Sequence, residues 1–484
     1  ATKKKMLQAA AGNAGGAGLD ITEVFSTYLY DGTSASLTIN NGIDLAGDDG
    51  LTWIKCRNAA EDHFLFSSLQ NGSGQTLFLK SNTTGAAVAT NGVSQTSTGF
   101  TVPVDGMVNQ TNNNYASFTF RKAPKFFDIV QYTGNGATHR DVPHNLESAP
   151  GWVITKRLDA AYNWQVYSKA SAAEYKLHRL NTTDATSVNY NPSNVNYNWT
   201  DTVFYASSYY SFADTNANGV SYVSYLFANH NSDGEFGPDS DQDIIKCGSF
   251  PWGSTSGTEV NLGFEPQWII FKAADQAGKD WYIFDAMRGI VTGGLSGDGD
   301  AALFANTSGS ENVNTWGVDL TATGFIAYGN NIASSGNIIY MAVRRGPLAL
   351  PEAGTEVFKP VLATSTDAYS VGFETDFALF NKLAGLSFNT IATTRLQGGG
   401  KRLSTATTAA ETSSNVVEFD LQDSFKQNIL GSSPLVRYHW KRAPSYFDAV
   451  CYSGTGVAGR TVSHNLGVAP EMIWAKRRDA AVSW

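Results

Sequence analysis

The sequence predicts an all-β fold, a series of antiparallel, jelly-roll-like β-sandwich modules of about 100 residues each, behind a short N-terminal anchoring segment. Composition is the first reason, because only 16% of residues are charged while 12% are aromatic and 47 are Gly. Such a mixture favours short strands joined by tight turns and disfavours helical bundles. The second reason is an internal repeat.

Residues 120–164 recur as residues 440–484, with 21 identities in 45 ungapped pairs. Chance does not produce this agreement, so the chain contains a duplicated building unit. The second copy stops at Trp484 in the middle of a unit. We therefore expect the natural polypeptide to continue.

The duplicated block belongs to a shorter unit with fixed spacing. Three units carry an Asn, then a Pro five residues later, then a Lys six residues after the Pro: Asn145, Pro150 and Lys156; Asn261, Pro266 and Lys272; Asn465, Pro470 and Lys476. Complete units close on an alternating strand, usually followed by a basic pair and Pro, which ends strand pairing. The turn strings Thr133–Gly136 and Ser453–Gly456 are typical of hairpin tips.

These signals divide the chain into an anchor with a Gly-rich hinge, four complete modules and the start of a fifth. The predicted boundaries are 1–21 for the anchor, then 22–125, 126–236, 237–350, 351–444 and 445–484 for modules 1 to 5. Because serial repeats pack on their neighbours, we expect a long shape in which each module contacts only the next.

Charge and cysteine content exclude several classes of protein. The net charge of −9 is modest and spread out, whereas a nucleic-acid-binding protein would show a clustered basic face. The three cysteines, Cys56, Cys247 and Cys451, are far apart in the sequence and do not form a disulfide framework. We expect them to be buried free thiols, and we expect the protein to be made in a reducing cytoplasm. No apolar run is long enough for a membrane span or a signal peptide.

The candidates for catalysis have simpler structural interpretations. Residues 454–459 spell GxGxxG, but a strand follows them and the duplicate loses the last Gly, so they indicate a turn rather than a dinucleotide site. His144 and His464 precede Asn-Leu at strand ends, where imidazole can bond the next turn. Module 3 has Val260 at that place, and no nucleophile accompanies the histidines. We expect no enzyme activity and no cofactor.

An acidic cluster joins modules 2 and 3. Five carboxylates fall within residues 233–243, and a calcium site on Asp233, Asp239, Asp241 and Asp243 is the alternative to a solvated linker. Their spacing does not match an EF-hand loop, so we expect no metal site.

The basic pairs and the aromatic runs have two interpretations each. Arg121-Lys122, Arg344-Arg345 and Lys441-Arg442 are expected to bridge to acidic residues of a neighbouring module or protomer, with anionic glycans or phosphates as the alternative. Phe204-Tyr205 and Tyr209-Tyr210 are expected to pack inside the fold, with stacking on sugars as the alternative.

Several motifs in order resemble large structural proteins of marine tailed bacteriophages. They are KKKMLQAAAG, YLYDG, ASFTFRKAPKFFD, YTGNG with HNL, NLGFEPQWIIFK and FDAMRGIV, and they span essentially the whole chain. Module 4 departs from this pattern, since it lacks the HNL segment and carries GGGKR instead.

The resemblance implies a virion component, most simply a tail fibre that positions a distal host-receptor-binding region. It implies phage tail or adaptor proteins as partners, a homotrimer, a host-surface glycan as ligand, and synthesis in the host cytoplasm. The expected attachment residues are Lys3, Lys4, Lys5, Met6 and Leu7. A carbohydrate-binding module array and a capsid decoration protein are the alternatives. No nucleic acid and no membrane insertion are expected.

Overall fold

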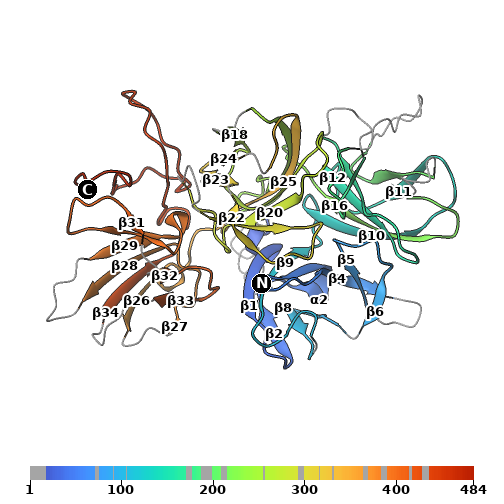
Figure 1. Ribbon diagram of the computed structural model, residues 1–484, viewed down its shortest axis with the longest axis horizontal. Coiled ribbons are helices and arrows are strands. Elements are labelled where there is room, and N and C mark those ends of the chain that lie inside the picture. Colours follow the sequence, from blue (N-terminus) through green and yellow to red (C-terminus); the bar gives the residue numbers. More distant parts are fainter. Residues whose placement is uncertain are drawn as a thin grey trace, which may run out of the picture.

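The fold is nearly all β, with 42% of the described residues in strands and 3% in helices. The prediction of antiparallel β-sandwich modules is therefore confirmed. Figure 1 shows modules 1, 2 and 3 gathered together and module 4 beside them. The computed structural model describes residues 18–70, 76–90, 92–104, 106–170, 177–186, 199–208, 215–253, 257–292, 299–315, 317–329, 332–363, 369–382, 390–413, 417–427 and 435–484.

Module 1 pairs a six-stranded sheet with a three-stranded one. The larger sheet has the order β1 (Phe25–Asp31), β9 (Asn114–Arg121), β3 (Gly50–Cys56), β4 (His63–Gln70), β5 (Thr76–Lys80) and β6 (Val88–Thr90). The smaller sheet has the order β2 (Leu37–Asn40), β8 (Gly99–Val102) and β7 (Ser94–Thr96). Two short helical turns accompany the strands: η1 (Ile21–Glu23) precedes β1, and α2 (Leu45–Asp48) lies between β2 and β3.

Modules 2 and 3 repeat this plan. The larger sheet of module 2 has the order β10 (Phe127–Thr133), β16 (Ser221–Phe227), β12 (Trp152–Arg157), β13 (Gln165–Ser168) and β14 (Leu177–Arg179), beside β11 (Arg140–Pro143) and β15 (Val203–Ala206). That of module 3 has the order β17 (Ile245–Pro251), β25 (Asn337–Arg344), β19 (Pro266–Ala273), β20 (Trp281–Asp285), β21 (Asp300–Phe304) and β22 (Asn312–Thr315), beside β18 (Thr258–Asn261), β24 (Gly324–Ala327) and β23 (Val318–Thr321).

Module 4 has the same two sheets. The larger has the order β26 (Phe358–Ala363), β34 (Leu435–Trp440), β28 (Phe377–Lys382), β29 (Ile391–Thr394), β30 (Lys401–Ser404) and β31 (Thr412–Ser413). The smaller has the order β27 (Tyr369–Ser370), β33 (Ser424–Gln427) and β32 (Val417–Glu418). Its helical turns are η2 (Gly354–Glu356) and η3 (Arg395–Gln397).

The last strand of each complete module lies inside its larger sheet. β9, β16, β25 and β34 each pair with the first strand of their module on one side and with the third on the other. A module therefore completes its sheet only when its last strand is in place.

Residues 445–484 are all described but form no strand. Their one regular backbone pairing is the bridge between Ala443 and Phe447. In module 2, the equivalent strands β10 and β12 are held by β16, and β11 is held by β15. Residues 445–484 hold no counterpart of these two partner strands, which explains why they stay unpaired.

The turn strings differ from the prediction. β10 pairs with β16 in the larger sheet, whereas β11 pairs with β15 in the smaller one. Thr133–Gly136 therefore crosses between two sheets and is not a hairpin tip. Gly136 has a φ of 76° and Gly456 a φ of 72°, so the Gly residues serve the change of direction that the crossover needs.

The larger sheets of modules 1, 2 and 3 are buried on both faces, and this changes the predicted arrangement of modules. In β4, Phe64 and Phe66 face the smaller sheet of module 1, while Leu65 between them belongs to a different cluster. That second cluster joins residues of modules 1, 2 and 3, among them Phe118, Trp152 and Trp268. The inner faces of the three larger sheets thus share one core.

Modules 1 to 3 form a closed triangular arrangement, which we call the ring. The expectation that each module contacts only its neighbour in sequence is wrong, because module 1 packs directly on module 3. Phe25, Phe118 and Phe120 of module 1 lie 5.5 to 6.2 Å, centroid to centroid, from Trp268 of module 3. Three similar apolar faces bury more surface around a common centre than in a row.

Candidate functional site: the joints between modules

A buried lysine makes an equivalent contact at each of the three joints of the ring. Each lies on the third strand of its module and is fully buried. Each ammonium group donates a hydrogen bond to a backbone carbonyl of the adjoining module: Lys156 to Thr84 at 3.1 Å, Lys272 to Thr183 at 3.4 Å and Lys55 to Ser308 at 3.3 Å. Burial lowers the pKa of all three lysines to about 8.

A backbone hydrogen bond accompanies each lysine contact. The carbonyl two positions after each Lys accepts from a backbone N–H of the adjoining module: Leu158 from Ala87 at 2.9 Å, Ala274 from Thr186 at 2.8 Å and Arg57 from Glu311 at 2.7 Å. At two joints an indole N–H adds a further bond, from Trp164 to the carbonyl of Lys80 and from Trp281 to that of Arg179, both at 2.9 Å. His63 takes the equivalent place at the third joint. The ring therefore has approximate threefold symmetry within one chain.

Asp20 fastens the two ends of the ring. One carboxylate oxygen of Asp20 accepts from the backbone N–H of Leu348 and of Ala349, each at 2.8 Å. The other accepts from Thr22 at 3.0 Å and so starts the turn η1. A single carboxylate thus holds the exit of module 3 against the entrance of module 1.

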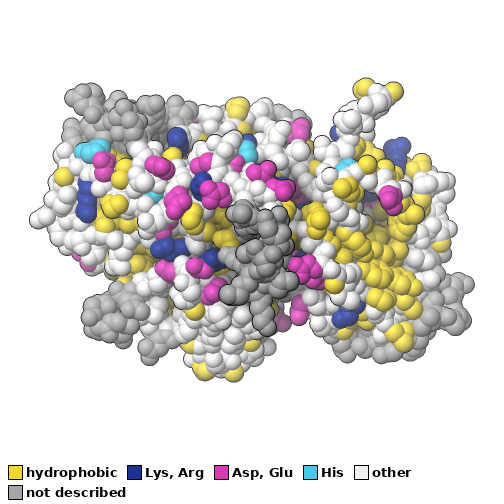
Figure 2. Space-filling view, turned by 180° about the vertical axis from the view of Figure 1, so that it is seen from behind, with side chains coloured by type: hydrophobic (Ala, Val, Ile, Leu, Met, Phe, Trp, Pro, Cys, Tyr) yellow, Lys and Arg dark blue, Asp and Glu magenta, His cyan; other side chains and the backbone are white. Residues whose placement is uncertain are grey.

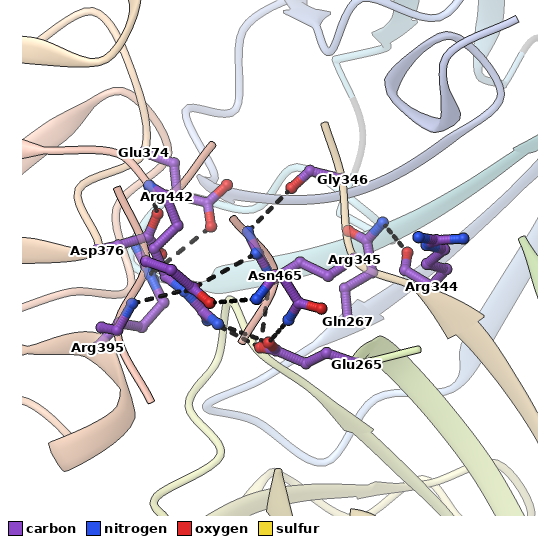
Figure 3. Close-up of polar contacts among 12 residues, drawn as sticks. Glu265, Gln267, Arg344, Arg345, Gly346, Glu374, Asp376, Arg395, Arg442 and Asn465 are labelled. Atoms are coloured by element: carbon purple, nitrogen blue, oxygen red, sulfur yellow. Dashed lines mark hydrogen bonds and ion pairs between the residues drawn. The ribbon is translucent and has the colours of Figure 1, made fainter. Parts of the chain in front are cut away.

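A cluster of ion pairs, which we call the charged junction, joins module 3 to module 4 (Figure 3). Arg442 follows β34 and forms a bidentate pair with Glu265 of module 3, at 2.8 and 2.5 Å. Its Nε also donates to Asp448 at 2.7 Å. Asn465 donates to Glu265 at 2.9 Å and to Asp448 at 2.7 Å. Arg345 lies 3.5 Å from Glu265 and 3.8 Å from Asp448.

A second arginine lies behind the first in the charged junction. Arg395, in η3, donates to the carbonyls of Phe419 and Thr375 at 2.7 and 2.9 Å. Its Nε lies 3.6 Å from Asp376 and 3.7 Å from Glu374. These side chains line a small cleft between modules 3 and 4 together with apolar residues.

The electrostatics of the charged junction favour the ionised pair at its centre. Burial alone would lower the pKa of Arg442, but Glu265 and Asp448 raise it well above its ordinary value. Burial would likewise raise the pKa of Asp448, but Arg442 and Arg345 hold it below the usual range. Asp376 differs, because burial and the neighbouring Glu374 raise its pKa. Buried arginines held by carboxylates on two modules make a rigid joint.

One residue of each basic pair bridges to an acidic residue of a neighbouring module, as predicted, whereas Arg121 pairs with Asp48 of its own module. Lys122 lies 3.3 Å from Asp128 of module 2, and Arg345 and Arg442 form the charged junction. The pairing of Arg442 with Glu265 could not have been predicted, because 177 residues separate them. The sequence did carry a signal for the lysine contacts, since Lys156 and Lys272 each follow the Pro of the repeat by six residues.

The histidines of the repeat bond the next turn, as predicted. His144 is buried and its Nδ1 accepts from the backbone of Leu146 at 3.1 Å. His464 makes the same bond to Leu466 at 3.3 Å. Burial lowers the pKa of His144.

The acidic cluster and the aromatic runs lie apart from these joints. Asp243 is buried beside His230, at 3.1 Å. Within the described ranges, which include Asp233, Asp239 and Asp241, no three His, Cys, Asp or Glu side chains gather around a possible metal position. Phe204 and Tyr205 are buried, as predicted.

Two sets of predicted residues lie outside the described residues. The attachment residues are Lys3, Lys4, Lys5, Met6 and Leu7, and the second aromatic pair is Tyr209-Tyr210. Cys56 and Cys247 are buried free thiols, and Cys451 is half-buried. Where the structure describes the chain, no helix is long and apolar enough to cross a membrane.

One known protein family matches the part of the chain that forms the ring. The model of a domain of unknown function, DUF7483, matches residues 20–347. No curated protein matches the chain. The matched span runs from Asp20, which fastens the ring, to Pro347, next to the residues that Asp20 holds. The matched span and the ring therefore coincide.

Proposed function

The chain belongs to the DUF7483 family, and we propose that it is a structural component of a phage virion, a tail fibre that carries a distal receptor-binding region. The proposal starts from the resemblance of the sequence motifs to structural proteins of marine tailed phages. One structural observation supports it: buried lysines and a buried arginine form contacts across the joints between modules.

A fibre must transmit position over a distance, and this needs rigid joints. In the ring, three lysines and a shared aromatic core fix three modules around one centre. The charged junction then fixes module 4 to module 3 through Arg442 and Glu265. Buried bidentate pairs hold orientation as well as distance. A chain built in this way is suited to a structural role.

In this proposal the N-terminal segment attaches the chain to tail or adaptor proteins, and three copies assemble on a threefold axis. Host-surface glycan would bind at the distal region.

The test uses purified particles of the phage whose genome encodes the chain. Gold-labelled antibody raised against residues 20–347 should mark the tail in electron micrographs. Label on the capsid would support the decoration protein instead, and particles that lack the chain would contradict any virion role. Glycan binding by the chain without particles would favour the carbohydrate-binding array.

A further inference from the structure

Residues 445–484 contact module 4 in the same way that residues 125–164 contact module 1. The participating residues of 445–484 lie 320 positions after those of 125–164, and their partners in module 4 lie 324 positions after those in module 1. The equivalent contacts are Lys476 to the carbonyl of Thr408 at 3.1 Å, Glu411 N–H to the carbonyl of Arg478 at 2.7 Å and the Trp484 indole to the carbonyl of Ser404 at 2.7 Å. These repeat the lysine, backbone and indole contacts of the ring.

Although the two sets of contacts agree, the equivalent side chains differ in how far they are buried. Trp152, Val153 and Ile154 of β12 are at most 4% exposed. Their counterparts Met472, Ile473 and Trp474 are 74%, 74% and 59% exposed. The strand that covers and pairs with β12 in module 2 is β16, and residues 445–484 hold no such strand.

The inner face of the larger sheet of module 4 is also open. When the strand pairings of modules 4 and 1 are compared, Leu362 occupies the position of Leu29, and Tyr438 occupies the position of Phe118. Leu362 is 60% exposed against 8% for Leu29, and Tyr438 is 36% exposed against 0% for Phe118. Figure 2 shows hydrophobic side chains gathered over module 4. An exposed apolar patch of this kind marks an interaction surface.

We propose that module 4 and residues 445–484 begin a second ring, and that their open faces bind β-sheets of the type found in modules 2 and 3. The partner has a stated chemistry: a last strand patterned like β16 that pairs with residues 447–453 and 472–477, and aromatic side chains that fill the ring centre. This inference is independent of a virion role.

Continuity with the first ring is the reason for this partner. The joint between module 4 and residues 445–484 already has the geometry of the joint between modules 1 and 2. Phe377, Ala392 and Leu403 cluster on the inner face of module 4, as Leu51, Leu65 and Leu79 do in the shared core. Asn381 takes the place of Lys55, so the joint on that edge has a different polar contact.

The test appends a second copy of residues 165–347 directly after Trp484, because Trp484 is the counterpart of Trp164. Hydrogen exchange of the backbone amides in 447–453 and 472–477 should slow by at least about a hundredfold. Binding of an apolar dye by the chain should fall by at least about threefold as the faces are covered. The matched control is the same graft with its appended copies changed, Phe227→Asp and Trp268→Asp, which should leave both readouts near those of the parent.

Unchanged exchange and dye binding in the first graft would overturn the proposal. The proposal would also be overturned if mass photometry showed the parent chain as an oligomer and hydrogen exchange showed Leu362 and Tyr438 protected in it, because the partner would then be a second copy.

A variant of the parent keeps the test valid if the graft fails to fold. Lys476→Met should speed proteolytic release of residues 445–484 by at least about threefold, whereas the exposed Arg477→Ala should not. Equal cleavage of the two variants would refute the ring-like joint.

Discussion

Replacing Trp268 by Ala tests whether modules 1 and 3 share a core. Trp268 belongs to module 3 and is fully buried, yet its ring packs on Phe25, Phe118 and Phe120 of module 1. Its indole N–H has no hydrogen-bond partner among the described residues. The substitution therefore removes packing without leaving a polar group unpaired.

The expected loss is about 3 to 5 kcal/mol in the free energy of unfolding, as for other buried aromatic residues changed to Ala. Because three of its aromatic contacts belong to module 1, we expect module 1 to lose protection as well as module 3. Hydrogen exchange of the amides of β9 reads this out. A loss of about 3 kcal/mol corresponds to exchange roughly a hundredfold faster.

The matched control is Trp474→Ala, since Trp474 is 59% exposed and should change stability by less than about 0.5 kcal/mol. If Trp268→Ala speeds exchange in module 3 while β9 keeps the exchange rates of the parent, modules 1 and 3 unfold independently. That result would refute the shared core.

Three further predictions concern the charged junction, pH and the ring closure. Arg442→Met should destabilise the docking of module 4 by about 3 to 5 kcal/mol, because it removes the bidentate partner of the buried Glu265, to which only Asn465 and the more distant Arg345 remain; faster proteolysis between modules 3 and 4 would show this, with the exposed Arg477→Met as the unaffected control. Burial lowers the pKa of His439 to about 3, so the unfolded state takes up a proton first as the pH falls below about 6.5. Module 4 should lose up to about 1.4 kcal/mol per pH unit between about pH 6.5 and 3, and urea midpoints that fall equally in His439→Phe would contradict this cause. Asp20→Ala should cost about 1 to 3 kcal/mol, measured as a lower unfolding midpoint of the ring; an unchanged midpoint would show that the two backbone bonds contribute nothing.

The repeat and the strand patterns were sufficient to predict the sandwich modules. Alternation in runs such as β9 and the Gly- and Asn-rich turns are local signals, and local signals decide strands. The role of His144 in bonding the next turn was predictable for the same reason, because its partner is two residues away.

The closed ring was not predictable by the same reasoning. The joint between Lys55 and Ser308 spans 253 residues, and no local pattern encodes such a partner. One signal was present: Phe64, Leu65 and Phe66 form a continuous apolar run in β4, where a half-exposed strand would alternate. Such a run indicates a strand buried on both faces, and the shared core supplies the second face.

A crystal structure of the full chain tests the closed ring most directly. The account predicts that modules 1 and 3 are in contact and that three buried ammonium groups reach carbonyls of the adjoining module, in the pairs Lys55–Ser308, Lys156–Thr84 and Lys272–Thr183. An extended chain, with Trp268 exposed and module 1 in contact with module 2 alone, would contradict it.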